Sequence, residues 1–169
     1  TATLQVKAVG LNFQDVLEVL GMRSGGAGLR GECAGVACIG GTPHCVEVLG
    51  MASGSLSAFA TADPCFLSPM PAQWSFEEAS AMPTVWTTVW TALEELSGLV
   101  LGGGVFVQAG TGGVGLASVR YAQRAGARVC ATAGRAAKVA YLQHLGVCMV
   151  SSTRDGNVLA AELPAMLGC

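Results

Sequence analysis

The spacing of apolar positions changes about halfway along this chain. In the first half, short apolar runs are separated by glycine, serine and proline, which is typical of strands joined by turns. These runs cover residues 4–9, 33–39, 46–51 and 58–62. One helical interval interrupts them, with four apolar side chains on one face, at Phe13, Val16, Leu17 and Leu20. We therefore expect a β-rich module over residues 1–80.

The second half alternates between helical and strand patterns. Ser75 and Glu78 form a capping-box pattern that starts a helix, and Pro83 ends or restarts it. The further elements expected are helix 84–96, strand 105–109, helix 113–125, strand 128–133, helix 135–145, strand 147–151 and helix 157–167. In helix 113–125 an expected packing stripe contains Val114, Ala117, Tyr121, Ala122 and Ala125. Strand–helix–strand–helix–strand order predicts an α/β fold, with one half of a Rossmann domain over residues 81–169.

A glycine-rich turn joins the first of these strands to its helix. It consists of Gly110, Thr111, Gly112, Gly113, Val114 and Gly115. Glycines 110, 112 and 115 stand in the G-x-G-x-x-G register, which brings backbone amides close to a pyrophosphate at a helix N-terminus. We therefore predict that all six residues contact a dinucleotide.

The end of the next strand indicates which dinucleotide. NAD-binding folds carry an acidic residue about 20 positions after the glycines, where it accepts hydrogen bonds from the ribose 2′-hydroxyl. Residues 131–138 contain no acid and instead offer Thr132, Gly134, Arg135 and Lys138. A guanidinium and an ammonium suit a 2′-phosphate, so the sequence favours NADPH as cofactor. The alternative is that both cations are ordinary solvated residues at a helix start.

Composition narrows the class of protein. Hydrophobic residues make up 51% of the 169 positions, and the net charge of −2 argues against a nucleic-acid-binding surface. The seven cysteines include no C-x-x-C pair, so a disulfide framework and a zinc ribbon are disfavoured, and we expect free buried thiols in a reducing cytoplasm. The uncharged interval 96–119 is interrupted by glycines, unlike a membrane span.

Several collinear motifs resemble one known family. They cover residues 9–17, 20–22, 31–36, 69–71, 74–79, 82–84, 110–115 and 131–134. Together they resemble the enoyl reductase domains of polyketide and animal-type fatty acid synthases. These domains belong to the zinc-free, quinone-oxidoreductase-like branch of the medium-chain dehydrogenase/reductase superfamily.

The resemblance implies a GroES-like β-rich substrate domain followed by a Rossmann domain. It implies NADPH-dependent reduction of an α,β-enoyl thioester carried by an acyl carrier protein, next to neighbouring synthase domains and in a homodimer formed through the parent synthase. The chain lacks an initiator methionine, and it ends before a second Rossmann half. From this we expect a piece of a longer polypeptide, with weak NADPH binding, little reduction, and an exposed third strand of the parallel sheet.

The resemblance also assigns site residues. Asn12 and Asp15 match the family's N-x-x-D turn beside nicotinamide and substrate, and Thr88 matches a threonine that approaches the nicotinamide ribose or amide. For each, a purely local structural role is the alternative. Zinc-using relatives carry histidine at the position of Gly31, so no metal is expected. His44 and His144 are expected in core or surface roles, and Trp86 and Trp90 in core or interface packing.

Two departures from the family leave alternatives open. Many relatives have a tyrosine where this chain has Arg23, and arginine is a poor general acid. The family's Gly-Asp-Arg-Val run is replaced here by residues 45–48, after a shortened loop. The alternatives to an enoyl reductase are a stand-alone quinone or alkenal reductase and a degenerate, non-catalytic remnant of a synthase.

Overall fold

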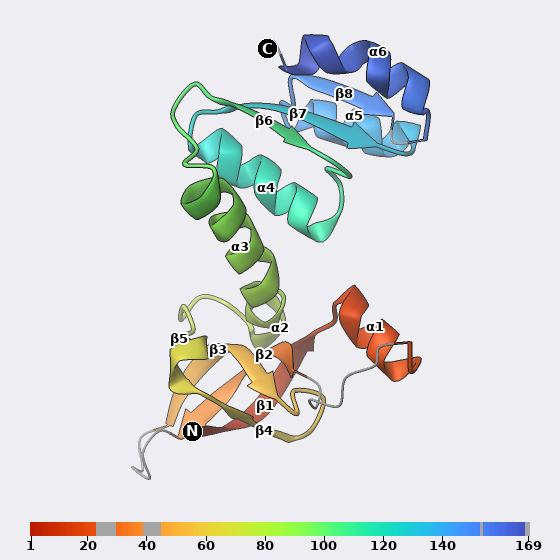
Figure 1. The fold of residues 1–169 in the computed structure, drawn as a ribbon. Coiled ribbons are helices and arrows are strands. Elements are labelled where there is room, and N and C mark those ends of the chain that lie inside the picture. Colours follow the sequence, from red (N-terminus) through yellow and green to blue (C-terminus); the bar gives the residue numbers. More distant parts are fainter. Residues whose placement is uncertain (23–29, 39–44, 153, 168–169) are drawn as a thin grey trace. The chain divides into compact units, whose positions relative to one another are not determined.

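The computed structural model describes residues 1–22, 30–38, 45–152 and 154–167 (Figure 1). The chain divides into two compact units, Thr1–Thr84 and Val85–Cys169, and each is described by itself. The division falls four residues after the expected boundary at residue 80, inside a helix rather than before it.

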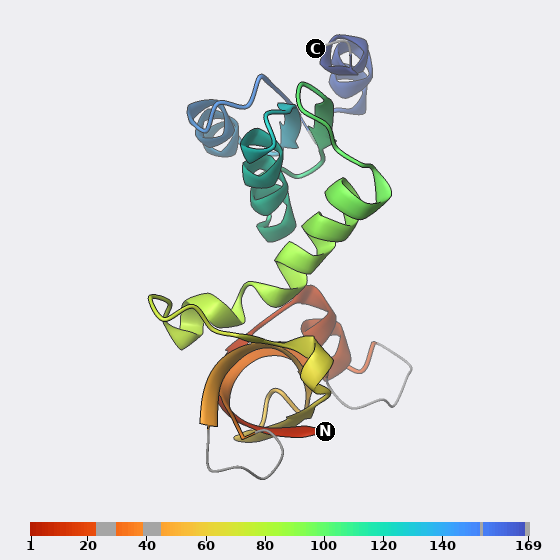
Figure 2. The same ribbon diagram turned by 90° about the vertical axis from the view of Figure 1, so that its left-hand side faces the viewer.

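The first unit is built around an antiparallel sheet. Its strand order is β2-β1-β4-β3-β5, and β2 also pairs with β3, so the first four strands close into a ring (Figure 2). The elements are β1 (Ala2–Gly10), α1 (Phe13–Val19), β2 (Arg30–Cys38), β3 (Cys45–Ser53), β4 (Phe59–Ala62), the 3-10 turn η1 (Pro64–Phe66), β5 (Leu67–Pro69) and α2 (Phe76–Ser80). The expected β-rich module is confirmed, and η1 and β5 are additions to it.

Alternating side chains of this ring form its core. Leu4 and Cys33 are fully buried, and Val48 is 2% exposed. The predicted capping box is confirmed at the start of α2. The Glu78 N–H donates to Ser75 Oγ over 3.2 Å, and the Ser75 N–H donates to Glu78 Oε2 over 3.0 Å. These two bonds satisfy amides that the first turn of a helix leaves unpaired.

The helix α1 forms as predicted, but its apolar side chains are not packed in a core. Phe13 is 75% exposed and Val16 47%, as is Leu20, just after the helix, at 64%, while Asp15 is buried, at 5%. The buried Asp15 carboxylate accepts the Asn12 N–H over 2.7 Å, so the inward face of this helix carries a hydrogen-bonded acid.

The second unit contains a three-stranded parallel sheet in the order β6-β7-β8. Its elements are α3 (Pro83–Trp90), which begins in the first unit, the π-helical segment η2 (Thr91–Leu96), β6 (Gly104–Val107), α4 (Gly113–Arg124), β7 (Arg128–Ala133), α5 (Ala136–His144), β8 (Met149–Ser152) and α6 (Gly156–Leu167). The predicted βαβαβ order is confirmed, and β7 has the predicted bounds. The expected single helix 84–96 is corrected, because its second half winds as a π-helix. The third strand, β8, is one edge of the described sheet, and β6 is the other edge.

The face of α4 that packs on the sheet differs from the expected stripe. Its buried residues are Gly115, Ala117, Val119 and Ala122, whereas Val114 is 41% exposed. The helix turns Gly115 toward the strand because only a residue without a side chain fits there: a Cβ would lie 2.4 Å from the Ala109 carbonyl oxygen. The predicted place of Val114 in the packing stripe is therefore wrong.

The two tryptophans of α3 are partly exposed to solvent and are not buried in a core. Trp86 is 37% exposed and Trp90 is 50% exposed. The Trp90 ring meets Tyr121 edge-on, with centroids 6.3 Å apart, inside the second unit. Among the described residues, no helix is long and apolar enough to cross a membrane.

Candidate functional site

The glycine turn leads from the carboxyl end of β6 into α4. Ala109 takes a positive φ of 51°, a conformation that a residue with a side chain seldom adopts. The Gly112 N–H donates to the Ala109 carbonyl over 2.8 Å, which closes the turn. Gly112 caps α4 with extended backbone and no side-chain hydrogen bond, so the helix begins with amides that a bound anion could pair.

Two glycines of the turn are required by close packing. At Gly110, a Cβ would lie 2.9 Å from the Ala131 side chain and 3.1 Å from Leu142. At Gly115, it would lie 2.4 Å from the Ala109 carbonyl oxygen. The first and third glycines of the motif therefore let the strand, turn and helix approach one another, and the backbone at Gly112 is exposed.

Thr132, on β7, holds the turn through two hydrogen bonds to its backbone. Its side chain is fully buried, its hydroxyl accepts the Ala109 N–H over 3.0 Å, and its carbonyl accepts the Gly110 N–H over 2.9 Å. The prediction that this hydroxyl meets a 2′-phosphate is corrected, because burial removes it from any ligand. Thr132 instead positions the turn that would hold the nucleotide.

A cleft of about 390 Å³ lies beside the turn, between the N-termini of α4 and α5. Its lining residues are Ala109, Thr111, Gly112, Ala133, Gly134, Arg135, Lys138 and Arg154. The structure thus brings the predicted Arg135 and Lys138 to the same hollow as Thr111 and Gly112. A second hollow, of about 490 Å³, also borders the turn and is lined by Gly113, Val114 and Gly115 among others.

Arg154 is a third cation of this cleft, and the sequence reasoning missed it. It follows β8 by two residues and belongs to no motif. Its place just after a parallel strand is the signal that could have indicated a role in binding.

Arg135 is the N-cap of α5, with extended backbone and no side-chain hydrogen bond. Two uncapped helix N-termini and three basic side chains therefore surround one hollow.

The chemistry of this hollow fits a dinucleotide phosphate. Helix N-termini offer unpaired N–H groups and a partial positive charge, and both stabilise an anion. The space over Gly112 is free of side chains, and exposed Arg135 and Lys138 lie along the same cleft. NADPH fits these residues, because its pyrophosphate and 2′-phosphate both need such donors.

Asn12 and Asp15 meet at the start of α1 in the first unit. The Asn12 N–H donates to Asp15 Oδ2 over 2.7 Å, and Asn12 Nδ2 donates to Glu32 Oε1 over the same distance. The other oxygen of Glu32 accepts the Thr84 N–H over 2.8 Å. Glu32 is 3% exposed and Asp15 is 5% exposed. The buried Glu32 carboxylate therefore fixes the Asn12 amide, a positioning role that sequence reasoning did not assign.

The remaining predicted positions are distributed as follows. Thr88 is exposed on α3, in the unit that does not contain Asn12. Arg23 and His44 lie outside the described residues, and His144 is exposed at the end of α5. Within the described part of the chain, no three His, Cys, Asp or Glu residues gather to hold a metal ion.

Gly31 is the position at which the sequence resemblance places the histidine of zinc-using relatives. A Cβ at Gly31 would lie 2.5 Å from the Ser55 hydroxyl, which is buried and has no hydrogen-bond partner among the described residues. Any larger residue at position 31 would therefore have to displace Ser55.

An apolar groove of about 220 Å³ lies beside Asp15 in the same unit. It is lined by Leu11, Asp15, Val16, Val19, Leu20 and Leu56. The exposed face of α1 thus forms one wall of an apolar hollow that is also lined by Asp15, the hydrogen-bond partner of Asn12. Such a surface suits a hydrocarbon chain.

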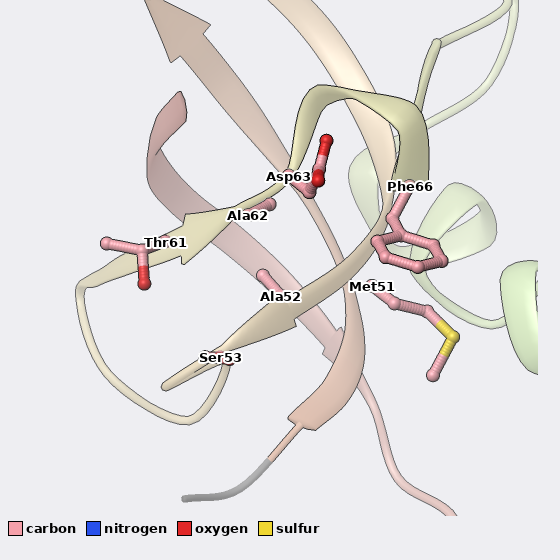
Figure 3. A pocket seen from close by; sticks show the side chains of 7 residues that line it. All are labelled: Met51, Ala52, Ser53, Thr61, Ala62, Asp63 and Phe66. Atoms are coloured by element: carbon pink, nitrogen blue, oxygen red, sulfur yellow. The ribbon is translucent and has the colours of Figure 1, made fainter. Parts of the chain in front are cut away.

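A further hollow of about 280 Å³ opens on the sheet of the first unit, between β3, β4 and η1 (Figure 3). Phe66 and Met51 lie together on one side of it, and Asp63 lies on the η1 turn. The Asp63 carboxylate accepts the Cys65 N–H over 3.1 Å, which lowers the pKa of Asp63. None of the predicted site residues lines this hollow.

Known proteins similar to this chain agree with its architecture. The chain is 42% identical over 136 residues to the spectinabilin polyketide synthase system protein NorB of Streptomyces orinoci, across 78% of this chain and 6% of that protein. It is 31% identical to the solved CurK enoyl reductase, with a TM-score of 0.85 over 99% of this chain and 55% of that one. Quinone oxidoreductase of Thermus thermophilus, also solved with NADPH, is 32% identical, with a TM-score of 0.76 over 97% and 52%.

The chain spans about half the length of these solved relatives and a small part of the synthase. No family model matches it. The shared architecture runs through both units, from the antiparallel ring to the parallel sheet with its glycine turn. The chain belongs with the enoyl reductase domains of polyketide synthases, in the quinone-oxidoreductase-like branch of the medium-chain dehydrogenase/reductase superfamily.

Proposed function

We propose that this chain binds NADPH and takes part in reducing an α,β-enoyl thioester, carried by an acyl carrier protein, within a cytoplasmic polyketide or fatty acid synthase. The observation that carries the proposal is the cleft between the N-termini of α4 and α5, with its glycine turn and three basic residues. Solved relatives add support, since one is an enoyl reductase and another has been solved with NADPH.

In the second unit, the residues of the turn bind and orient the nucleotide. The uncapped amides at the start of α4 face the pyrophosphate, and Arg135, Lys138 and Arg154 hold the 2′-phosphate. Thr88 on α3 approaches the nicotinamide end. When bound, the reduced nicotinamide supplies a hydride to the β-carbon of the enoyl group.

In the first unit, Asn12 stabilises charge on the thioester oxygen. An amide nitrogen carries two hydrogens, and the bond to Glu32 uses one of them. The second can donate to a carbonyl oxygen whose negative charge grows as hydride arrives at the β-carbon. The apolar groove beside Asp15 gives the acyl chain a water-poor surface, which favours an enoyl thioester over a small polar substrate.

The test is product detection. The chain is incubated with NADPH deuterated at the transferable position of the nicotinamide and with crotonyl-coenzyme A, or in parallel with a benzoquinone. We expect butyryl thioester bearing one deuterium, and less of it for Asn12→Ala than for the control Gly156→Ala, where a Cβ meets nothing within 4 Å.

The alternatives give other results. Consumption of NADPH with the quinone, but no butyryl thioester, would identify a quinone reductase. NADPH binding without turnover of either substrate would indicate a non-catalytic remnant. Either outcome would overturn the proposal of enoyl reduction.

A further inference from the structure

Two exposed cysteines lie opposite each other on neighbouring strands of the first unit. In the antiparallel pairing of β2 with β3, Cys38 is the direct partner of Cys45, and this is the last pair of the ladder. Both thiols are free and exposed. Side chains of directly opposed residues point to the same face of a sheet, with Cβ atoms about 4.5–5.5 Å apart.

That separation is close to what a disulfide needs. Disulfide-bonded cysteines have Cβ atoms about 3.5–4.5 Å apart, so the two strands need to close by about an ångström at the end of the ladder. The interaction of Cys38 with Cys45 is the largest reason that the pKa of Cys38 is raised. The strand register therefore already places the two thiols for a disulfide.

We propose that Cys38 and Cys45 form a reversible intramolecular disulfide when the protein meets a small-molecule disulfide such as oxidised glutathione. This site is independent of the proposed reductase activity, and it revises the expectation that the thiols of this chain are buried.

The reaction is balanced thiol–disulfide exchange. The thiolate of one cysteine attacks a sulfur of oxidised glutathione, forming a mixed disulfide and releasing one glutathione thiolate. The thiolate of the second cysteine then attacks the sulfur of the first, and the second glutathione leaves. The protein loses two protons and two electrons, and the oxidant becomes two molecules of glutathione.

The neighbouring Cys33 provides a built-in comparison. It lies on the same strand, but it is fully buried, and burial, followed by the nearby Glu32, raises the pKa of its thiol to about 11. A buried thiol with so little thiolate neither attacks a disulfide nor reaches one. Cys33 should therefore stay reduced when Cys38 and Cys45 react.

Peptide mapping tests the bond on the wild-type chain. After equilibration with oxidised glutathione, free thiols are alkylated, disulfides are reduced, and the newly released thiols receive a second label. A glutamate-specific protease cutting after Glu32 and Glu47 gives a peptide of residues 33–47 that holds Cys33, Cys38 and Cys45. We expect the second label on Cys38 and Cys45 in equal amounts and none on Cys33.

Variants and melting give an independent readout. Oxidation should raise the melting temperature of the wild-type chain, because the bond closes a loop in the unfolded state. Cys38→Ser and Cys45→Ser should each lose this increase, whereas Cys148→Ser, at another exposed cysteine, should keep it. Glutathione adducts on both cysteines without an internal bond, or a bond from either to a different cysteine or a second copy, would overturn the proposal.

Discussion

At the scale of single residues, the buried Glu32 carboxylate holds together Asn12 and Thr84, which are far apart in the sequence of the first unit. Its two carboxylate oxygens accept hydrogen bonds from Asn12 Nδ2 and the Thr84 N–H, and the side chain is 3% exposed. Gly10 allows this arrangement, because a Cβ there would lie 2.6 Å from the Glu32 side chain. One buried acid thus links the connection between β1 and α1 to the start of α3.

Replacement of Glu32 should lower the stability of this unit. Glu32→Ala leaves two donors without their acceptor, and a hydrogen bond to a charged group contributes about 1.5–3 kcal/mol. We therefore expect the free energy of unfolding to fall by roughly 2–4 kcal/mol. Urea unfolding followed by circular dichroism measures it.

The matched control is Glu47→Ala, because Glu47 is an exposed acid on the neighbouring strand β3. Its free energy of unfolding should change by less than about 0.5 kcal/mol. Equal losses in the two variants would show that the buried bonds of Glu32 are not what stabilises the unit.

At the scale of elements, the turn between β6 and α4 depends on backbone shape rather than side chains. Ala109 has a positive φ, Gly115 lies against the Ala109 carbonyl, and buried Thr132 accepts the Ala109 N–H. Each feature holds the first amides of α4 in place without covering them. The turn should therefore respond sharply to an added Cβ at Gly115.

Gly115→Ala should disrupt nucleotide binding. Its Cβ would lie 2.4 Å from the Ala109 carbonyl oxygen, so either the helix start or the turn must shift. We expect NADPH affinity to fall at least about tenfold, equivalent to about 1.4 kcal/mol, as measured by quenching of the protein's tryptophan fluorescence. Gly156→Ala, which adds a Cβ in open space, should keep the wild-type affinity. Unchanged binding by Gly115→Ala would mean that the turn does not hold the nucleotide.

At the scale of the whole molecule, the sequence predicted the elements with strong periodicity. Strand β7 has the predicted bounds because residues 127–133, apolar except for Arg128 and Thr132, lie between two glycines and fit a buried parallel strand. Strand β5 and η1 were missed because three residues are too few to show a period. The π-helical winding of η2 leaves no mark in the spacing of its side chains.

The candidate site was predictable where a motif fixes the backbone. Five of the six turn residues and the cations at 135 and 138 line neighbouring hollows of the second unit, whereas Gly110 is buried and lines neither. Thr132 was misjudged because a strand pattern does not tell which hydroxyl faces inward. Arg154 and Glu32 were missed because their roles arise from residues distant in the sequence.

The cleft's charge is a local property of a chain whose net charge is −2. Arg135, Lys138 and Arg154 all line one cleft, and they follow the carboxyl ends of β7 and β8. Arg128 lies at the other end of β7, where the strand begins. A ligand that gains affinity from the three cleft cations, but not from Arg128, must place its negative charge in this cleft. The 2′-phosphate is the group that distinguishes NADPH from NADH.

The most direct measurement is a pair of titrations, with NADPH and with NADH, on the wild-type chain and on Arg135→Ala, Lys138→Ala and the control Arg128→Ala. We predict that the wild type and Arg128→Ala bind NADPH at least about tenfold more tightly than NADH, and that each cleft variant loses most of this preference without losing NADH affinity. Equal affinity for the two nucleotides in the wild type, or a preference that survives both cleft substitutions, would contradict the assignment of this cleft to the 2′-phosphate of NADPH.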